Sequence, residues 1–321
     1  MRGKRSLFAG LVAVGCGALA WIQFSAPKAL TPEQMAARYE TPLSPPEGPL
    51  NVFHLGHSLV GQDMPAMLAQ LAEHSHASQL GWGTPLRAHW NADEPIQGFE
   101  TENAHAHYRD AKEALSSGDF DAFVLTEMVE IEAAIAHFDA PLYLEKWVAA
   151  ARDANPDIRI FLYETWHELT DPQGWMYRLD TDPAKYWEGV LLARTMAELP
   201  DASPVYVIPA GRVMAEFVRR IEDSEGVDGV TSRKDLFARA EDGALDPIHI
   251  NDLGAYLVAI THFAVLYQRS PVGLPAELLR ADGMAATAPG PDLARLMQQT
   301  VWDVVSSLPV TGIPQNAVVL Q

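Results

Sequence analysis

Short apolar runs recur along the chain, and longer stretches with helical spacing of their apolar residues separate them. The runs cover Leu50–Leu55, Ala122–Thr126, Ile158–Glu164 and Val205–Pro209. Runs of this length without polar alternation are typical of strands that are buried on both faces. We therefore predict an α/β protein in which a mainly parallel sheet lies between two helical layers, a three-layer αβα sandwich.

The remaining elements follow from the same spacing. A further strand is expected near Gln79–Trp82, between the first two runs. The helical patterns supply the connections that parallel strands require. Helices are expected over Met64–His74, Thr101–Leu115, Pro141–Asp153, Lys185–Leu199, Arg212–Ile221, Asp252–Tyr267 and Pro291–Ser306.

The amino terminus has the pattern of a membrane-targeting signal. Residues 2–5 carry three positive charges, and Leu7–Phe24 is an uncharged, mostly apolar run that is about long enough to span a bilayer. We expect residues 1–26 to form a signal anchor or a cleaved signal peptide, and Cys16 in a loose lipobox leaves lipidation open. The protein would then face the periplasm from the inner membrane, or be periplasmic or extracellular after cleavage.

Two further segments follow the signal. Residues 27–48 contain five prolines, which fix φ and remove amide donors, so we predict an extended Pro-rich tether. No second linker of this kind appears, which favours a single domain over residues 49–321. The net charge of −19 disfavours a nucleic-acid partner, because such binding needs clustered Lys and Arg. The only cysteine, Cys16, excludes an intramolecular disulfide and a Cys-ligated zinc site.

Reactive side chains follow the first predicted strand and precede a late helix. Ser58 lies in Gly56-His57-Ser58-Leu59, where a strand-to-helix turn can expose its hydroxyl; a helix-capping serine is the structural alternative. Far along the chain, Asp246 stands three residues before His249. On a loop, this carboxylate can turn back and accept the Nδ1 proton, which leaves Nε2 free to deprotonate a serine. Asp252 is the lesser candidate, because it falls at the start of the next helix.

Together these two segments resemble the most specific blocks of the SGNH (GDSL-like) hydrolase family, and the resemblance spans residues 50–270. It implies a flavodoxin-like αβα fold and a serine esterase that needs no cofactor or metal. Carried onto this chain, it makes Ser58 the nucleophile, His249 the general base and Asp246 the residue that orients the base. The amides of Ser58 and Gly83 would form the oxyanion hole.

The chain departs from the family at its third block, which normally supplies an asparagine after a strand. Thr126 and Glu127 stand there instead, and a carboxylate would repel a developing oxyanion. Asn91 or Asn103 could substitute if their loops return to the site. We expect Thr126, Glu127, Trp166 and Asn91 to line the substrate pocket.

Two functions remain open from the sequence. The first is an exported esterase that cleaves or transfers an acyl group of a small-molecule or glycan ester, such as an O-acetyl group. The second is a non-catalytic glycan- or ligand-binding module that keeps the fold. Histidine spacing alone does not predict a metal site, because a site needs three or four converging ligands. This applies to His54 and His57 and to the His-x-His pairs at residues 74–76 and 105–107.

Overall fold

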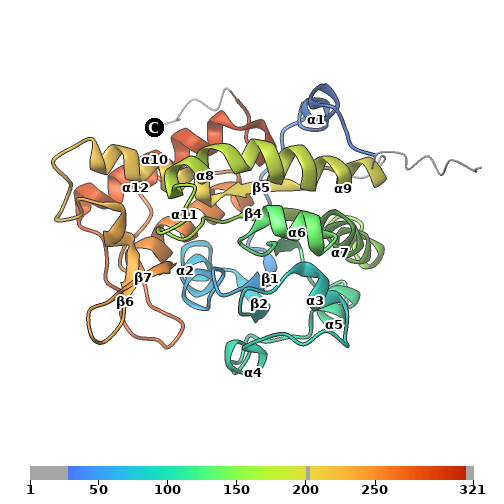
Figure 1. The fold of residues 1–321 in the computed structure, drawn as a ribbon, viewed down its shortest axis with the longest axis horizontal. Coiled ribbons are helices and arrows are strands. Elements are labelled where there is room, and N and C mark those ends of the chain that lie inside the picture. The colour runs from blue at the N-terminus through green and yellow to red at the C-terminus, as the bar shows by residue number, and fades with distance from the viewer. Residues whose placement is uncertain (1–27, 200–202, 316–321) are drawn as a thin grey trace, which may run out of the picture.

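Five parallel strands form the central sheet (Figure 1). The computed structural model describes residues 28–199 and 203–315 of the chain. The strand order is β2-β1-β3-β4-β5, and each neighbouring pair is parallel. The strands are β1 (Asn51–His57), β2 (Ser75–Gly81), β3 (Ala122–Leu125), β4 (Arg159–Glu164) and β5 (Tyr206–Pro209).

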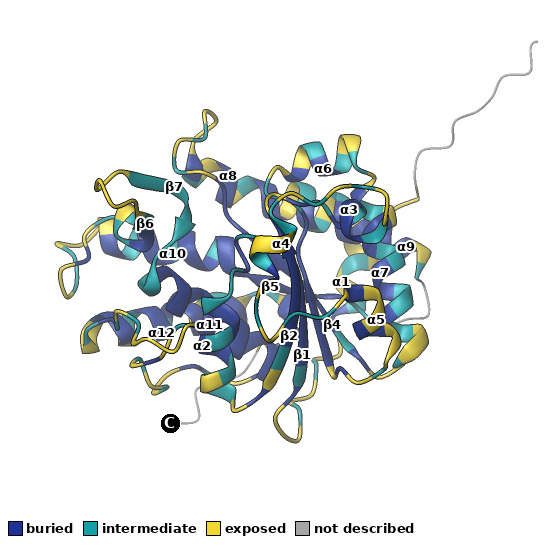
Figure 2. Cartoon of the chain, turned by 90° about the horizontal axis from the view of Figure 1, so that it is seen from below, coloured by how far each residue is buried: buried dark blue, intermediate teal, exposed yellow. Residues whose placement is uncertain are grey.

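Helices cover both faces of this sheet, which Figure 2 shows nearly edge-on. One layer contains α2 (Asp63–Ala72), α10 (Ala210–Glu222), α11 (Asp252–Tyr267) and α12 (Pro291–Ser307). The other contains α3 (Leu86–Trp90), α5 (Ala111–Ser116), α7 (Ala140–Ala154) and α9 (Ala193–Glu198). Shorter elements connect them: α4 (Phe99–Glu102), α6 (Ile131–His137), α8 (Trp175–Asp182), the π-helical η1 (Pro183–Leu192) and the 3₁₀ turns η2 (Arg233–Leu236) and η3 (Pro309–Thr311).

The predicted three-layer αβα sandwich is confirmed, and its physical basis is visible in the strands. Phe53 on β1, Phe123 on β3 and Phe161 on β4 are all fully buried, because helices pack against both faces of the sheet. Such strands have no solvent face, which explains why their sequences lack polar alternation.

One predicted helix is divided. The pattern over Thr101–Leu115 forms α4 and α5 with an irregular stretch between them. Asn103 ends α4 by bonding both the amide and the carbonyl of Leu80 on β2, and Asp110 starts α5 by accepting from the Glu113 amide. These side chains compete with the helical backbone, as Asn and Asp do at turns.

The predicted extended tether is wrong for much of residues 28–48. Helix α1 (Pro32–Arg38) forms there, since Thr31 and Gln34 make a capping box and Pro32 fits the first helical position. Tyr39 then packs into the core and its hydroxyl donates to the Val205 carbonyl at 2.7 Å. The predicted signal over residues 1–26 lies outside the described residues. Within the part that is described, no helix has the length and apolarity to cross a bilayer.

An antiparallel pair, β6 (Phe237–Arg239) and β7 (Leu245–Ile250), lies outside the central sheet. Asp246 and His249 therefore stand on an irregular strand, where a loop was expected. Phe237 pairs with Ile250, and the register shifts before Arg239 pairs with Leu245. This bulged pairing fixes β7 directly before α11, which begins after the capping side chain of Asn251.

Candidate active site

Ser58 follows the last residue of β1 and precedes α2, at the carboxyl edge of the sheet. The glycine two residues before it is needed for close packing: a Cβ on Gly56 would lie 2.4 Å from Cγ2 of Thr126. Gly56 lies within β1 and is not in the left-handed region, so glycine is needed there for close packing and not for a positive φ. The ends of β1 and β3 approach closely there, which places Ser58 at the rim of the sheet.

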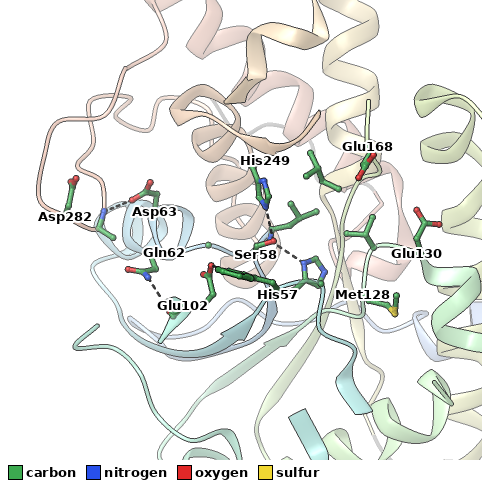
Figure 3. A pocket seen from close by; sticks show the side chains of 17 residues that line it. His57, Ser58, Gln62, Asp63, Glu102, Met128, Glu130, Glu168, His249 and Asp282 are labelled. Carbon is green, nitrogen blue, oxygen red and sulfur yellow. Dashed lines mark hydrogen bonds between the residues drawn. The ribbon is translucent and has the colours of Figure 1, made fainter. Parts of the chain in front are cut away.

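His249 joins the serine to the carboxylate. Its Nε2 lies 3.0 Å from Oγ of Ser58, and its Nδ1 lies 2.9 Å from Oδ2 of Asp246. Both hydrogen bonds expected from the sequence are present, with the partners in the expected order. Figure 3 shows the one between His249 and Ser58. In this arrangement Nδ1–H donates to Asp246, so the lone pair of Nε2 is directed at the hydroxyl.

Asp246 is itself held in place by the strand that carries it. Its Oδ1 accepts the amides of Ile248 and His249, each at 2.9 Å. Partial burial raises the pKa of Asp246, but these amides and the imidazole outweigh that effect, and the pKa lies below its ordinary value. The carboxylate thus stays ionised beside His249. Asp252 instead accepts the Thr287 amide, which excludes it as the orienting group.

The loop between β4 and α8 holds the backbone of β7 through two hydrogen bonds. The indole Nε1 of Trp166 donates to the Ile248 carbonyl at 2.8 Å, and the amide of Leu169 donates to the Pro247 carbonyl at 2.8 Å. Trp166 is 1% exposed and does not line the cavity beside Ser58, so its expected role in the substrate pocket is wrong. It holds the backbone next to His249.

Gly83 lies in the wall of this cavity, together with Ser58. Its φ is +56°, and a Cβ there would meet nothing within 4 Å. Within residues 28–199 and 203–315, neither the Ser58 nor the Gly83 amide donates to a backbone or side-chain acceptor. Free backbone amides in the wall of a cavity that also holds a serine hydroxyl are the kind of donor that an oxyanion hole uses.

Glu127 does not line the cavity, contrary to the expectation that it would belong to the substrate pocket. Its side chain is fully buried, and Oε1 accepts the amides of Leu86 at 3.2 Å and Met128 at 2.8 Å. Burial raises the pKa of Glu127 to about 7, although the two amides lower it. The carboxyl group thereby ties the start of α3, just beyond Gly83, to the end of β3.

The other two expected pocket residues also lie elsewhere. Thr126 is fully buried against Gly56, and its hydroxyl donates to the Glu127 carbonyl. Asn91 donates to Glu94 and to the Tyr143 hydroxyl, away from the cavity. Asn103, bonded to Leu80, supplies no substitute donor either.

Two buried histidines form hydrogen bonds with backbone carbonyls close to Ser58. Nε2 of His57 donates to the Glu127 carbonyl at 3.0 Å, and Nε2 of His89 donates to the Gly56 carbonyl at 2.8 Å. Burial lowers the pKa of each to about 4, so both are neutral at pH 7. They act as fixed hydrogen-bond donors, a role that spacing in the sequence did not reveal.

Ser58 and His249 both line two cavities. Arg239 and Arg280 line the smaller one, of about 450 Å³. The larger cavity, which also contains Gly83, has a volume of about 840 Å³. Figure 3 shows acidic side chains on both sides of Ser58, and among the described residues no Lys or Arg lines the cavity. Trp82 is 51% exposed at its wall, and its Nε1 donates to Glu102. No sequence pattern indicates these carboxylates, because they come from separate loops and helices: Asp63, Glu102, Glu130, Glu168 and Asp282.

The comparisons with known proteins bear on the fold alone. No protein-family model and no curated protein matches the sequence. Among solved structures, the chain is similar to a DUF4886 family protein from Bacteroides uniformis ATCC 8492, with 14% identity and a TM-score of 0.50 over 80% of this chain and 94% of that one. It also matches a carbohydrate esterase family 2 enzyme with a carbohydrate binding domain from Corynascus thermopiles (Myceliophthora fergusii), at 12% identity and a TM-score of 0.26 over 40% and 49%. At such identities the first similarity shows a shared αβα fold.

Proposed function

We propose that this protein is a serine esterase that forms an acyl-enzyme on Ser58. The observation that carries the proposal is the chain of hydrogen bonds from Ser58 Oγ through His249 to Asp246, which opens on the cavity. A helix-capping serine needs no imidazole at its hydroxyl. A nucleophile needs both the imidazole and the carboxylate behind it.

The geometry supports a two-step reaction. Oγ of Ser58 attacks the ester carbonyl while Nε2 of His249 takes its proton, and the charge on the carbonyl oxygen is stabilised by the amides of Ser58 and Gly83. The ester C–O bond then breaks, and His249 returns the proton to the leaving alkoxide. Water, deprotonated by His249, cleaves the acyl-enzyme and restores the serine. A sugar hydroxyl in place of water would make the same intermediate a transferase.

The lining of the cavity favours an uncharged ester. Its five carboxylates repel an anionic substrate, and their oxygens can accept hydrogen bonds from hydroxyl groups. The exposed ring of Trp82 offers an apolar face of the kind on which a sugar packs. These features support a neutral, hydroxyl-rich substrate such as an O-acetylated glycan. We further propose that the protein acts outside the cytoplasm, on the basis of the charged and apolar segment over residues 1–26.

One observation favours the alternative of a binding module: among the described residues, neither Asn91 nor Asn103 replaces the missing asparagine, and the amide of Gln62, which does line the cavity, donates to the Glu102 carbonyl. Covalent labelling separates the two functions. A fluorophosphonate should add one label per chain to the native protein and none to Ser58→Ala, and Ser116→Ala, which removes an exposed serine, serves as the control. Hydrolysis of p-nitrophenyl acetate should likewise be present in the native protein and in Ser116→Ala and absent in Ser58→Ala.

His249→Ala should slow both reactions nearly as much, because the nucleophile and the base act as a unit. Unchanged turnover in Ser58→Ala would exclude the proposed nucleophile. A native protein that takes no label, hydrolyses no ester and yet binds acetylated glycans would establish the binding module instead.

A further inference from the structure

A second cluster of chemically capable side chains lies beside the cavity, in the loop between β4 and α8. His167 is buried there, with 3% of its side chain exposed, and its Nε2 lies 3.0 Å from Oδ2 of Asp182. Asp182 also accepts from Nε of Arg178. Since Nε2–H donates to this carboxylate, Nδ1 is the ring nitrogen that remains available to a ligand. This nitrogen is buried and has no hydrogen-bond partner among the described residues.

The unpartnered nitrogen faces two further carboxylates. Oε1 of Glu130 lies 3.8 Å from Nδ1, too far for a hydrogen bond. One ligand atom from each of Glu130, His167 and Asp171 lies within 4.8 Å of the other two. An unpartnered imidazole nitrogen and two carboxylates that converge on one point are the kind of donors that a metal cation binds.

The surrounding contacts leave one oxygen of Glu130 unused, whereas Oδ1 of Asp171 accepts the Gln173 amide. Nη1 of Arg178 binds Oδ2 of Asp171 at 2.9 Å, and its Nη2 binds Oε2 of Glu130 at 3.3 Å, so the oxygen of Glu130 nearest His167 is not the one that Arg178 uses. Ionised Glu130, Asp171 and Asp182 carry three negative charges, and Arg178 carries one positive charge. The carboxylates and the guanidinium together therefore have a net charge of −2. A divalent cation would balance that charge.

The donor set identifies the class of ion. An imidazole nitrogen with two carboxylate oxygens suits zinc and similar divalent transition metals, whereas calcium and magnesium prefer oxygen alone. Histidines that bind metals usually donate their other N–H to a carboxylate, which is what His167 does toward Asp182. We propose that Glu130, His167 and Asp171 bind one divalent metal ion of the zinc type.

This site would connect two walls of the cavity. Glu130 follows β3 and lines the cavity, whereas His167 and Asp171 follow β4. The β4–α8 loop in turn holds β7 through Leu169. An ion at this position would fix the loop that supports His249, although binding itself does not require Ser58 to be a nucleophile. The family resemblance implied no metal, because these residues lie outside its motifs.

The test is a titration of metal-stripped protein with zinc chloride, followed by calorimetry, with cobalt(II) absorption as a spectroscopic probe. We expect one ion per chain and a melting temperature that rises with zinc concentration. His167→Gln and Asp171→Asn should each weaken binding more than about 100-fold, and Asp182→Asn about 10–100-fold, because it only orients the imidazole. His107→Ala is the matched control, since His107 stacks on His76 at the surface with ring centroids 4.1 Å apart.

Two results would overturn the proposal: no binding at zinc concentrations up to about 1 mM, or binding that His167→Gln leaves unchanged and His107→Ala abolishes. Circular dichroism without metal checks that each variant folds. If His167→Gln does not fold, Glu130→Gln replaces it. The Glu130 side chain is 51% exposed, so its amide variant should fold and should still lose zinc affinity.

Discussion

Trp166→Phe isolates the support that the β4–α8 loop gives to the proposed base. The indole ring is buried, and its N–H donates to the carbonyl of Ile248, the residue next to His249. Phenylalanine keeps most of the ring and removes the donor. Because Ile248 is only partly buried, water can reach its carbonyl, and we expect a loss of about 0.5–1.5 kcal/mol for the hydrogen bond. A void of roughly 40 Å³ adds about 1 kcal/mol.

The catalytic effect should exceed this modest loss of stability. The Leu169–Pro247 hydrogen bond remains, so β7 should shift rather than detach. A displacement of about 1 Å at a catalytic group costs about 100-fold in rate, and we expect kcat/KM to fall about 10–100-fold with little change in KM. Hydrolysis of p-nitrophenyl acetate and urea denaturation measure the two effects.

Trp302→Phe is the control for the loss of ring volume, because it shortens a buried indole on α12, far from β7 in the chain. It should cost about 1 kcal/mol and leave kcat/KM within about twofold of the native value. Equal kcat/KM in the two variants would refute the claim that Trp166 positions His249.

Three other expectations concern the site and its surroundings. Asp246→Asn should lower kcat by about 10²–10⁴ without unfolding the protein, because an amide cannot fix the Nδ1–H tautomer; steady-state kinetics measure this. Glu127→Gln keeps an acceptor for two buried amides, whereas Glu127→Leu leaves both unpaired and should cost about 2–4 kcal/mol in chemical denaturation. Burial lowers the pKa of His262 from 6.5 to about 4. The unfolded chain therefore binds more protons in that window, and the stability that His262 contributes, up to about 3 kcal/mol, is present above pH 6.5 and lost toward pH 4. His262→Leu should flatten the pH dependence of the unfolding free energy there.

The sheet could be predicted from the sequence because its evidence is local. Each buried strand is short, apolar and bounded by turn residues, and parallel strands share one carboxyl edge. Ser58 directly follows such a strand, which limited its position to that edge. His249 could be predicted as the partner of Ser58 because Asp246 lies only three residues before it, so the carboxylate can reach the imidazole.

The prediction of the residues that line the pocket was wrong for a physical reason. A position after a strand end says which edge a residue occupies but not which way its side chain points, and successive side chains alternate in direction. Glu127 points into the core toward the Leu86 amide, while Met128 lines the cavity. Trp166 is buried while Glu168, two residues on, lines the cavity, because the chain beyond β4 is no longer a strand and its side chains do not alternate regularly. Hydrogen-bond partners far along the chain decide these directions.

The acidic cavity raises a question about catalysis, because carboxylates oppose a developing oxyanion. A single carboxylate at about 10 Å shifts the energy of a unit charge by about 0.4–1.7 kcal/mol for effective dielectric constants of about 80–20. However, an imidazolium forms on His249 as the oxyanion forms, and the same carboxylates stabilise that positive charge. The two effects largely cancel for the chemical step, since the proposed transition state creates a pair of opposite charges. For a charged substrate no such cancellation occurs, because its charge interacts with the carboxylates before any opposite charge forms. The carboxylates around Ser58 are therefore compatible with ester cleavage and act mainly on selection, against anionic esters.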